Sequence, residues 1–213
     1  LSADIARLPL PLAQTLRRAL NAKSAQEAHT AAYYFFECAL KLSASAQIGV
    51  YVSLGCQDAQ LNELIENITR ASTGHWLAIL REVSSHLAKR PDKSLVPLAD
   101  VNERLTKKEP RPAARAFLDF VAKMTEKPDG RKSLNCLDLF DAIVNYRNQE
   151  LGHGAQRTRD FYAEAAPLIV DAAVEAINAL RPLGELQLSV ARDVIDPRSN
   201  RAARRKGVGR HMR

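Results

Sequence analysis

The side chains best suited to chemistry in this chain lie between Asn145 and Gly154, in the run Asn-Tyr-Arg-Asn-Gln-Glu-Leu-Gly-His-Gly. Arg147 and His153 are six positions apart in this run. An arginine neutralises the charge of a phosphate group, and a histidine takes up or releases a proton near neutral pH. These are the two groups that cleavage of an RNA phosphodiester requires when no metal ion takes part. The run is therefore the candidate site, and neighbouring elements must bring the two side chains together.

Arg147 and Asn148 lie on a helical stripe that is otherwise apolar. Intervals of three or four positions predict a helix over 133–151, with Ser133 as its N-cap. The apolar positions of this stripe are Leu137, Phe140, Val144 and Leu151. An arginine on such a stripe either loses its hydration at a cost in free energy or opens this face of the helix onto a cleft.

Two interpretations of the arginine and the histidine are compatible with this spacing. In the first, Arg147 forms an ion pair with a carboxylate such as Glu37 or Asp141, and His153 belongs to the helix cap. In the second, a turn at Gly152 folds His153 back towards Arg147, and the two side chains share a cleft. A histidine at a helix C-terminus is also favoured in its protonated form by the helix dipole, which suits a proton donor.

The runs Tyr146–Asn148 and Leu151–Gly154 resemble the signature of the HEPN superfamily. That signature is an arginine, often with asparagine beside it, followed by a histidine after four to six intervening residues. Here five residues intervene, near the end of the second-to-last long helix. A looser similarity extends over about residues 8–181 and includes the segments 36–41 and 74–76.

The resemblance implies an all-α, antiparallel helical bundle of the HEPN type that forms a homodimer through the helix carrying Arg147. It also implies a ribonuclease without a metal ion or other cofactor, in which the 2′-hydroxyl of RNA attacks the adjacent phosphate. The products would be a 2′,3′-cyclic phosphate and a 5′-hydroxyl, and the setting would be a toxin or antiphage defence system. Other members of the family have the fold without the cleavage. The alternative function is therefore a non-catalytic dimerisation or ligand-binding module of a bacterial signalling protein.

Carried over to this chain, the resemblance gives roles to three residues of the motif. Arg147 would stabilise negative charge on the phosphoryl oxygens, and His153 would act as general acid or base. Asn148 would orient the phosphate by hydrogen bonding. Glu37, on the long helix predicted over 25–48, would hold Arg147 in place.

Asp141 and Tyr146 lie on the helix that carries the motif and are expected to support the site. Arg157 and Arg159 follow the motif closely, so they either line a path for RNA or are ordinary solvated charges. His29 falls on the polar side of its predicted helix, and we expect an exposed side chain there.

The charge of the chain is concentrated at its C-terminal end. The net charge is +7, and residues 197–213 hold seven basic residues and no acidic ones. Residues 1–196 hold 24 basic and 24 acidic residues, so that part is electrically balanced. A domain with equal numbers of basic and acidic residues is not typical of a protein that binds long stretches of nucleic acid backbone. A small basic cleft is compatible with such a domain.

The cysteines and the apolar runs exclude several classes of protein. Cys38, Cys56 and Cys136 are widely spaced and odd in number, which argues against a disulfide framework or a zinc site. No apolar run approaches the ~18 residues of a membrane span, and no secretory signal precedes the first helix. We expect a cytoplasmic protein that has RNA as its partner and no association with a membrane. The glycine-rich phosphate-binding loops of nucleotide-binding proteins are absent from the sequence.

The periodicity predicts a helical domain over 1–184 and a shorter second region over 185–213. The predicted helices cover approximately 11–21, 25–48, 58–71, 74–89, 98–107, 112–125, 133–151 and 157–181. The three longest, 25–48, 133–151 and 157–181, are expected to pack antiparallel in a bundle. The weak alternation over Glu185–Ile195 favours one short strand, and a disordered basic tail follows. A lone strand needs a partner, and Leu1 stands in place of methionine, so we expect other domains in a longer parent chain.

Overall fold

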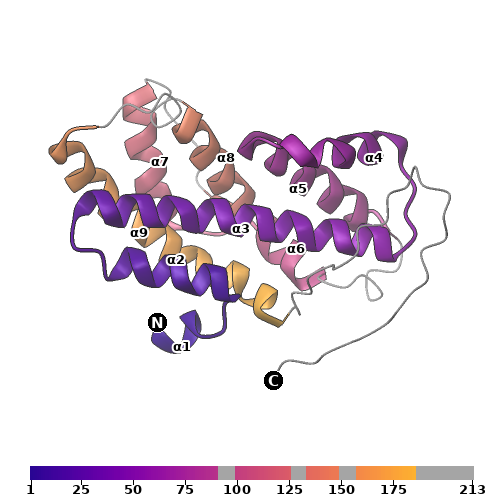
Figure 1. The fold of residues 1–213 in the computed structure, drawn as a ribbon, viewed down its shortest axis with the longest axis horizontal. Coiled ribbons are helices and arrows are strands. Elements are labelled where there is room, and N and C mark those ends of the chain that lie inside the picture. The colour runs from indigo at the N-terminus through magenta and orange to yellow at the C-terminus, as the bar shows by residue number, and fades with distance from the viewer. Residues whose placement is uncertain (91–98, 126–132, 149–156, 186–213) are drawn as a thin grey trace.

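A computed structural model describes residues 1–90, 99–125, 133–148 and 157–185, and the structural statements below concern these ranges. The regular structure of these ranges is helical, and the β pairing found there is a single isolated bridge between Glu109 and Leu134. The all-α prediction is therefore confirmed for the described residues. Figure 1 shows the helices α1 (Ser2–Ile5), α2 (Leu10–Leu20), α3 (Ala25–Ser53), α4 (Ala59–Glu66), α5 (Thr73–Ala88), α6 (Ala99–Thr106), α7 (Pro112–Thr125), α8 (Cys136–Tyr146) and α9 (Arg159–Leu180).

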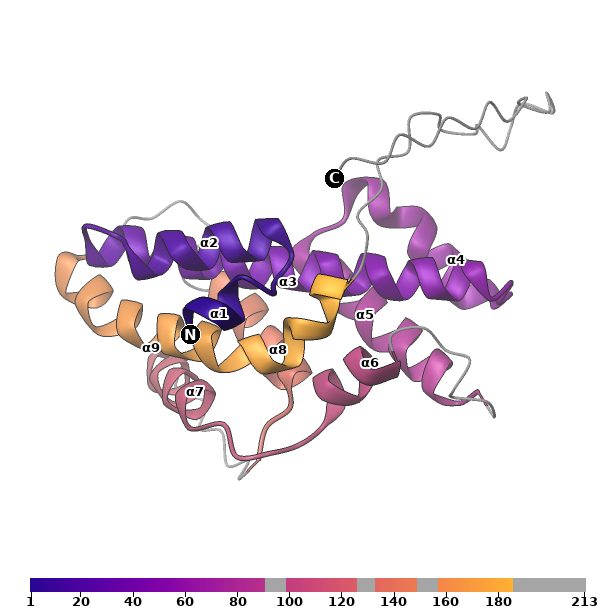
Figure 2. The same ribbon diagram turned by 90° about the horizontal axis from the view of Figure 1, so that it is seen from below.

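Helix α3 is the central element of the fold. It has 29 residues, and α2, α5, α8 and α9 all pack against it. Figures 1 and 2 show α2 and α9 beside its first half, with α5 beside its second half. Alanines at Ala31, Ala32, Ala39 and Ala44 are almost completely buried, so neighbouring helices approach its backbone closely. A helix covered on several sides is stabilised mainly by this packing.

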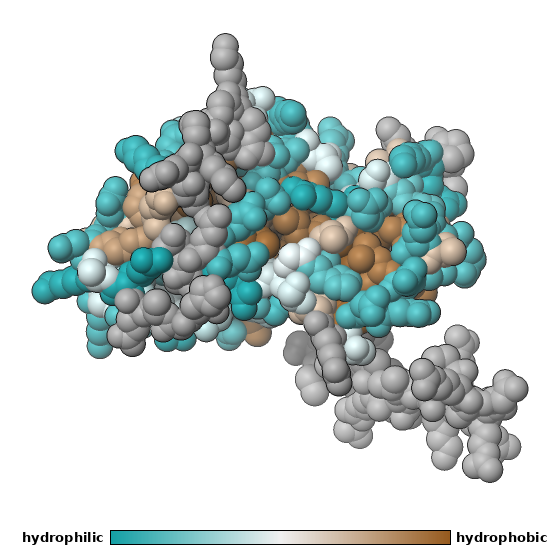
Figure 3. Space-filling model, turned by 90° about the horizontal axis from the view of Figure 1, so that it is seen from above, coloured by the Kyte–Doolittle hydropathy of each residue, from teal (hydrophilic) through white to brown (hydrophobic). Residues whose placement is uncertain are grey.

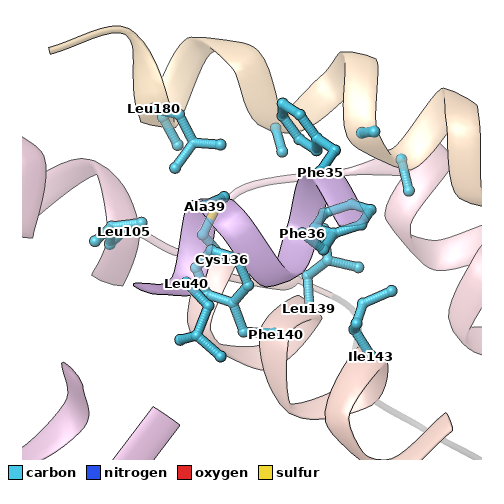
Figure 4. Packing of buried hydrophobic residues seen from close by; sticks show 14 of the residues in the cluster. Phe35, Phe36, Ala39, Leu40, Leu105, Cys136, Leu139, Phe140, Ile143 and Leu180 are labelled. Atoms are coloured by element: carbon cyan, nitrogen blue, oxygen red, sulfur yellow. The ribbon is translucent and has the colours of Figure 1, made fainter. Parts of the chain in front are cut away.

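The aromatic side chains of α3 fill the core between α8 and α9. The rings of Phe36 and Phe140 meet edge to face with centroids 6.4 Å apart, a favourable geometry for aromatic pairs. Figure 4 shows the packing around them, with the labelled side chains Phe35, Phe36, Ala39, Leu40, Leu105, Cys136, Leu139, Phe140, Ile143 and Leu180. Every one of these side chains is at most 2% exposed. Burial of such residues on several helices at once joins them into one core.

The predicted helix ends need modest corrections in the first half of the chain. The helix predicted over 25–48 continues through Gly49 to Ser53, although glycine costs about 1 kcal/mol relative to alanine in a helix. It stops before Gly55, which has φ +64°, a conformation that glycine adopts without strain. The helix predicted over 58–71 is divided into α4 and the 3-10 turn η1 (Asn67–Arg70).

The predicted N-cap of α8 was wrong by two residues. Asn135, and not Ser133, accepts a hydrogen bond from the backbone N–H of Asp138 at 2.8 Å. The Asp138 carboxylate accepts one from the backbone N–H of Asn135 at 3.0 Å, which completes a capping box. The α-helical part ends at Tyr146, and a π turn continues the chain through residues 147–148.

The first and last helices of the described chain lie against each other. The Arg181 guanidinium is 3.5 Å from the Asp4 carboxylate. A methyl group built on Gly184 would lie 1.8 Å from the carbonyl oxygen of Arg7, so only glycine fits there without a shift of backbone. Gly184 is part of the 3-10 turn η4 (Arg181–Glu185), which places Glu185 in a helical turn. The rest of the predicted strand and the basic tail lie outside the described residues.

The helices that the structure describes are all too short or too polar to serve as membrane spans. Cys38, Cys56 and Cys136 are free thiols. Cys136 is 1% exposed, and burial raises the pKa of its thiol to about 11. This thiol is therefore a small core residue.

Candidate functional site

Arg147 and Asn148 form the π turn at the C-terminal end of α8. A π turn is wider than an α turn and is frequent at functional sites. The Arg147 side chain is half-buried, and Asn148 is exposed beside it. The structure thus places the arginine and the asparagine of the motif side by side at the end of α8, as predicted. His153 lies outside the described residues.

The two named carboxylates of the first interpretation pair with other residues in the described part of the chain. The Glu37 carboxylate is 2.6 Å from the ammonium group of Lys41, one turn along α3. The Asp141 carboxylate is 3.3 Å from the guanidinium of Arg81 on α5. Among the described residues, no carboxylate lies within ion-pair distance of Arg147. The structure thus pairs Glu37 with Lys41 and Asp141 with Arg81, and it shows no ion pair of either acid with Arg147.

Arg147 instead acts on a buried phenol. The Tyr33 side chain is 7% exposed, and its hydroxyl oxygen has no hydrogen-bond partner. Burial, followed by the negative charge of Glu37, raises the pKa of Tyr33, while the positive charge of Arg147 and the neighbouring Thr73 lower it. Thr73 lies beside the phenol without a hydrogen bond of ordinary distance and angle. The environment of Tyr33 is therefore set by residues of α3 and α5 and by the charge of Arg147 at the end of α8.

The contacts between α5 and α8 show how these two helices run. Arg81 pairs with Asp141, and Gly74 faces the Val144 side chain, whose methyl carbon lies 3.8 Å from the position of an added Cβ. As α5 runs from 74 to 81, α8 therefore runs in the opposite direction, from 144 to 141. Arg147 follows Val144 by three residues, and Val144 contacts the N-terminal end of α5 at Gly74. Tyr33 is beside that same end of α5.

The N-terminal end of α5 has backbone donors available. Ser72 is the N-cap, and its hydroxyl accepts from the backbone N–H of His75 at 3.2 Å. This bond leaves the N–H groups of Thr73 and Gly74, the first two of the helix, without a partner among the described residues. Figure 3 shows the face of the molecule seen from above the view of Figure 1, where hydrophilic surface surrounds apolar patches.

Tyr146 is fully buried and fixes the end of α8 on α3. Its hydroxyl is 2.7 Å from the imidazole Nε2 of His29. His29 is 1% exposed and also meets the rings of Phe161 and Tyr162. Burial lowers the pKa of His29 from 6.5 to about 4, so its ring is neutral at pH 7. The prediction of an exposed His29 was wrong, because the end of α8 and the start of α9 cover this face of α3.

The two arginines after the motif are exposed at the start of α9. The guanidinium carbon of Arg157 lies 5.7 Å from the centre of the Phe161 ring, a distance typical of a cation–π contact. Phe161 in turn contacts the ring of His29. Arg157 therefore lies over the same aromatic cluster that holds Tyr146, whereas Arg159 has no such contact among the described residues.

Three residues of this region were missed or misread from the sequence. His29, Tyr33 and Glu37 are spaced by four along α3, so they share one side of that helix. This spacing is visible in the sequence. Their surroundings depend on the contacts of α3 with α5, α8 and α9, which no local pattern records.

Comparison of this chain with family models, with curated proteins and with solved structures found no match. The likeness to the HEPN superfamily therefore rests on the motif residues and the segments around them. Within the described ranges, no group of three or more histidine, cysteine, aspartate or glutamate side chains is arranged to hold a metal ion.

Proposed function

We propose that this chain is a HEPN-type domain that cleaves RNA in the cytoplasm without a metal ion. The 2′-hydroxyl of the substrate attacks the adjacent phosphate and expels the 5′-oxygen of the next nucleotide. The products are a 2′,3′-cyclic phosphate and a 5′-hydroxyl. The domain acts as a dimer through the helix that carries Arg147, and its biological setting is a toxin or antiphage defence system.

The observation that supports this proposal most is the half-buried position of Arg147, with no carboxylate partner among the described residues. Among the residues that the structure describes, this guanidinium has no carboxylate to compensate for its lost hydration. The predicted partners Glu37 and Asp141 are paired with Lys41 and Arg81. A bound phosphate would supply the missing negative charge. Arg147 is thus able to form paired hydrogen bonds to phosphoryl oxygens in the ground state and stronger ones as negative charge develops.

The neighbours of Arg147 suit this role. Asn148 is exposed beside it, and its amide is able to donate to a phosphate or to the ribose. The hydrogen bond between Tyr146 and His29 fixes the last α-helical turn before Arg147. His153 supplies the group that takes or gives a proton, six residues after the arginine.

Incubation of the full chain with total RNA in the presence of EDTA tests the proposal. We expect cleavage that leaves 5′-hydroxyl ends, which polynucleotide kinase labels directly. Arg147→Ala and His153→Ala should each lower the rate about 100-fold or more, as loss of a charge-stabilising group or a general acid does. Arg17→Ala, an exposed arginine of α2, is the matched control and should cleave at the parent rate.

Cleavage that persists unchanged in both Arg147→Ala and His153→Ala would show that a different site or a contaminant is responsible. Complete absence of cleavage by a folded, dimeric parent chain would favour the alternative, a non-catalytic HEPN module that dimerises or binds a ligand. Circular dichroism of each variant separates loss of activity from loss of the helical fold.

A further inference from the structure

One buried imidazole contacts both of the helix ends that border the candidate site. His29 lies on α3, and its Nε2 atom is 2.7 Å from the hydroxyl oxygen of Tyr146, the last residue of α8. The same ring meets the rings of Phe161 and Tyr162, in the first turn of α9, at centroid distances of 6.2 and 5.2 Å. His29 is therefore placed to hold the end of α8 and the start of α9 together.

In the part of the chain that the structure describes, little else joins these two helix ends directly. Helices α8 and α9 each pack against α3 and α7 and have little contact with each other. Phe117 of α7 meets the ring of Tyr146 at 5.5 Å, and Phe120 of the same helix meets the ring of Phe161 at 5.9 Å. Among the described ring contacts, each of these two phenylalanines touches one helix end, whereas His29 touches both.

The hydrogen bond makes this contact directional. Packed rings tolerate small shifts, whereas a hydrogen bond weakens steeply when its distance or angle changes. His29 and Tyr146 are both shielded from bulk water, so loss of the bond would leave buried polar groups unpaired at a cost in stability. Arg147 is the next residue in the chain, and the position of its backbone is therefore tied to that of His29.

The start of α9 is joined to an arginine as well. Arg157 precedes α9 by two residues, and its guanidinium carbon lies 5.7 Å from the centre of the Phe161 ring. Phe161 in turn lies against His29. Two guanidinium groups, one directly after α8 and one shortly before α9, thus depend on the same imidazole for their positions.

We infer that His29 is a positioning residue of this site, which sets Arg147 and Arg157 relative to each other so that both act on one RNA strand. The contacts of His29 with the two helix ends are independent of the chemistry, whereas their effect on RNA rests on the proposed function. His29 is too deeply buried to touch RNA itself and acts through Tyr146 and Phe161. A guanidinium that bonds to phosphoryl oxygens tolerates little displacement, since a shift of about 1 Å is able to cost about 100-fold in rate.

Two substitutions of His29 in the full chain test these contacts without any RNA. His29→Leu has no hydrogen-bonding group, whereas the amide of His29→Gln is able to reach the Tyr146 hydroxyl. In His29→Leu, amide hydrogen exchange at the end of α8 and the start of α9 should become about tenfold faster or more, because a buried hydrogen bond is lost. Exchange in α4, beside the opposite end of α3 in Figure 1, should remain as in the parent. His29→Gln should restore slow exchange at the end of α8.

Cleavage of RNA is the second measurement, made at a temperature where each variant is fully folded. We expect His29→Leu to lower kcat by about tenfold to 100-fold and His29→Gln to keep most of the parent value. A purely structural role for His29 predicts a lower unfolding temperature in His29→Leu with kcat of the folded protein unchanged. His86→Leu, a half-exposed histidine at the other end of α5, is the matched control and should cleave as the parent does. Tyr146→Phe, a smaller change, carries the same test at the end of α8 if His29→Leu does not fold.

The results distinguish failure of this inference from failure of the proposed function. Faster exchange confined to the two helix ends in His29→Leu, with no cleavage by the parent, supports positioning by His29 and overturns the ribonuclease. Cleavage by the parent with kcat unchanged in His29→Leu and Tyr146→Phe overturns the positioning role and leaves the ribonuclease standing. Exchange that is unchanged at the two helix ends, or that rises equally in α4, also overturns the positioning role.

Discussion

The buried imidazole of His29 should make the stability of this protein depend strongly on pH between neutrality and about pH 4. Burial lowers the pKa of His29 from 6.5 to about 4 in the folded protein. As the pH falls below 6.5, the unfolded chain binds a proton at this position before the folded chain does. The contribution of neutral His29 to stability is therefore complete above pH 6.5 and is lost as the pH falls through this window.

The size of the effect follows from the same two values. Each pH unit between the unfolded and folded pKa of His29 is worth about 1.4 kcal/mol. The interval from 6.5 to about 4 therefore corresponds to a loss of about 3 kcal/mol in the free energy of unfolding. Only 1% of His29 is exposed, so screening by solvent does not reduce this figure greatly. Such a loss is a large part of the stability of an ordinary domain.

The perturbation that isolates this effect is His29→Gln. A glutamine amide is able to reach the Tyr146 hydroxyl in place of Nε2 and has no charge at any pH used. Urea unfolding of both proteins, followed by circular dichroism, should show that the advantage of the parent over the variant shrinks by about 3 kcal/mol between about pH 7 and pH 4. Acid titration of the carboxylates is common to both proteins and cancels in the difference. His75→Gln is the control and should show the pH dependence of the parent. A difference between parent and His29→Gln that does not change with pH would refute the reasoning.

Two further predictions concern the contacts that α9 and its end make with the rest of the chain. Gly184→Ala should lower the free energy of unfolding by about 1–3 kcal/mol, measured by urea unfolding, because its methyl group would overlap the carbonyl oxygen of Arg7. An unchanged stability would mean that η4 shifts at no cost. Glu175→Gln should cost about 1 kcal/mol, because the Glu175 carboxylate accepts from the first backbone N–H groups of α7 at 2.9 and 3.3 Å. Glu164→Gln, at an exposed position of the same helix, should leave the melting temperature unchanged, and equal effects of the two substitutions would contradict the capping role.

The sequence was a good guide to the helices because their signals are local. The spacing of apolar residues identified α2, α5, α7 and α9, and Ser24, a residue type favoured at helix starts, is the N-cap of α3. The Glu27 carboxylate accepts from the backbone N–H of Lys23 and not from that of Ser24, so the capping box at the start of α3 is formed only in part. The N-cap of α8 was missed because Ser133 and Asn135 are both good caps. The bridge between Leu134 and Glu109 decides between them.

The candidate site was predictable only in its motif. Arg147 and Asn148 follow from the sequence, because their polar character interrupts an apolar stripe. The partners of Arg147 cannot be deduced from the sequence. The residues around Glu37 look the same whether its carboxylate pairs with Lys41 or with Arg147. Burial of His29 likewise depends on two helices that are more than 100 residues away in the sequence. Tertiary packing overrides the polar pattern of the helix in such a case.

Asp4 contacts Arg181 and Arg7 contacts Gly184, so the first and last described helical turns, α1 and η4, lie together. A domain of this form is suited to insertion into an exposed turn of a host protein, because the host needs little rearrangement to accommodate neighbouring entry and exit points. It also suits circular permutation, in which a short peptide joins the present ends and new ends are opened elsewhere. Force applied between the two ends would load the α1–η4 contacts first and leave the long central helix unstretched until they part.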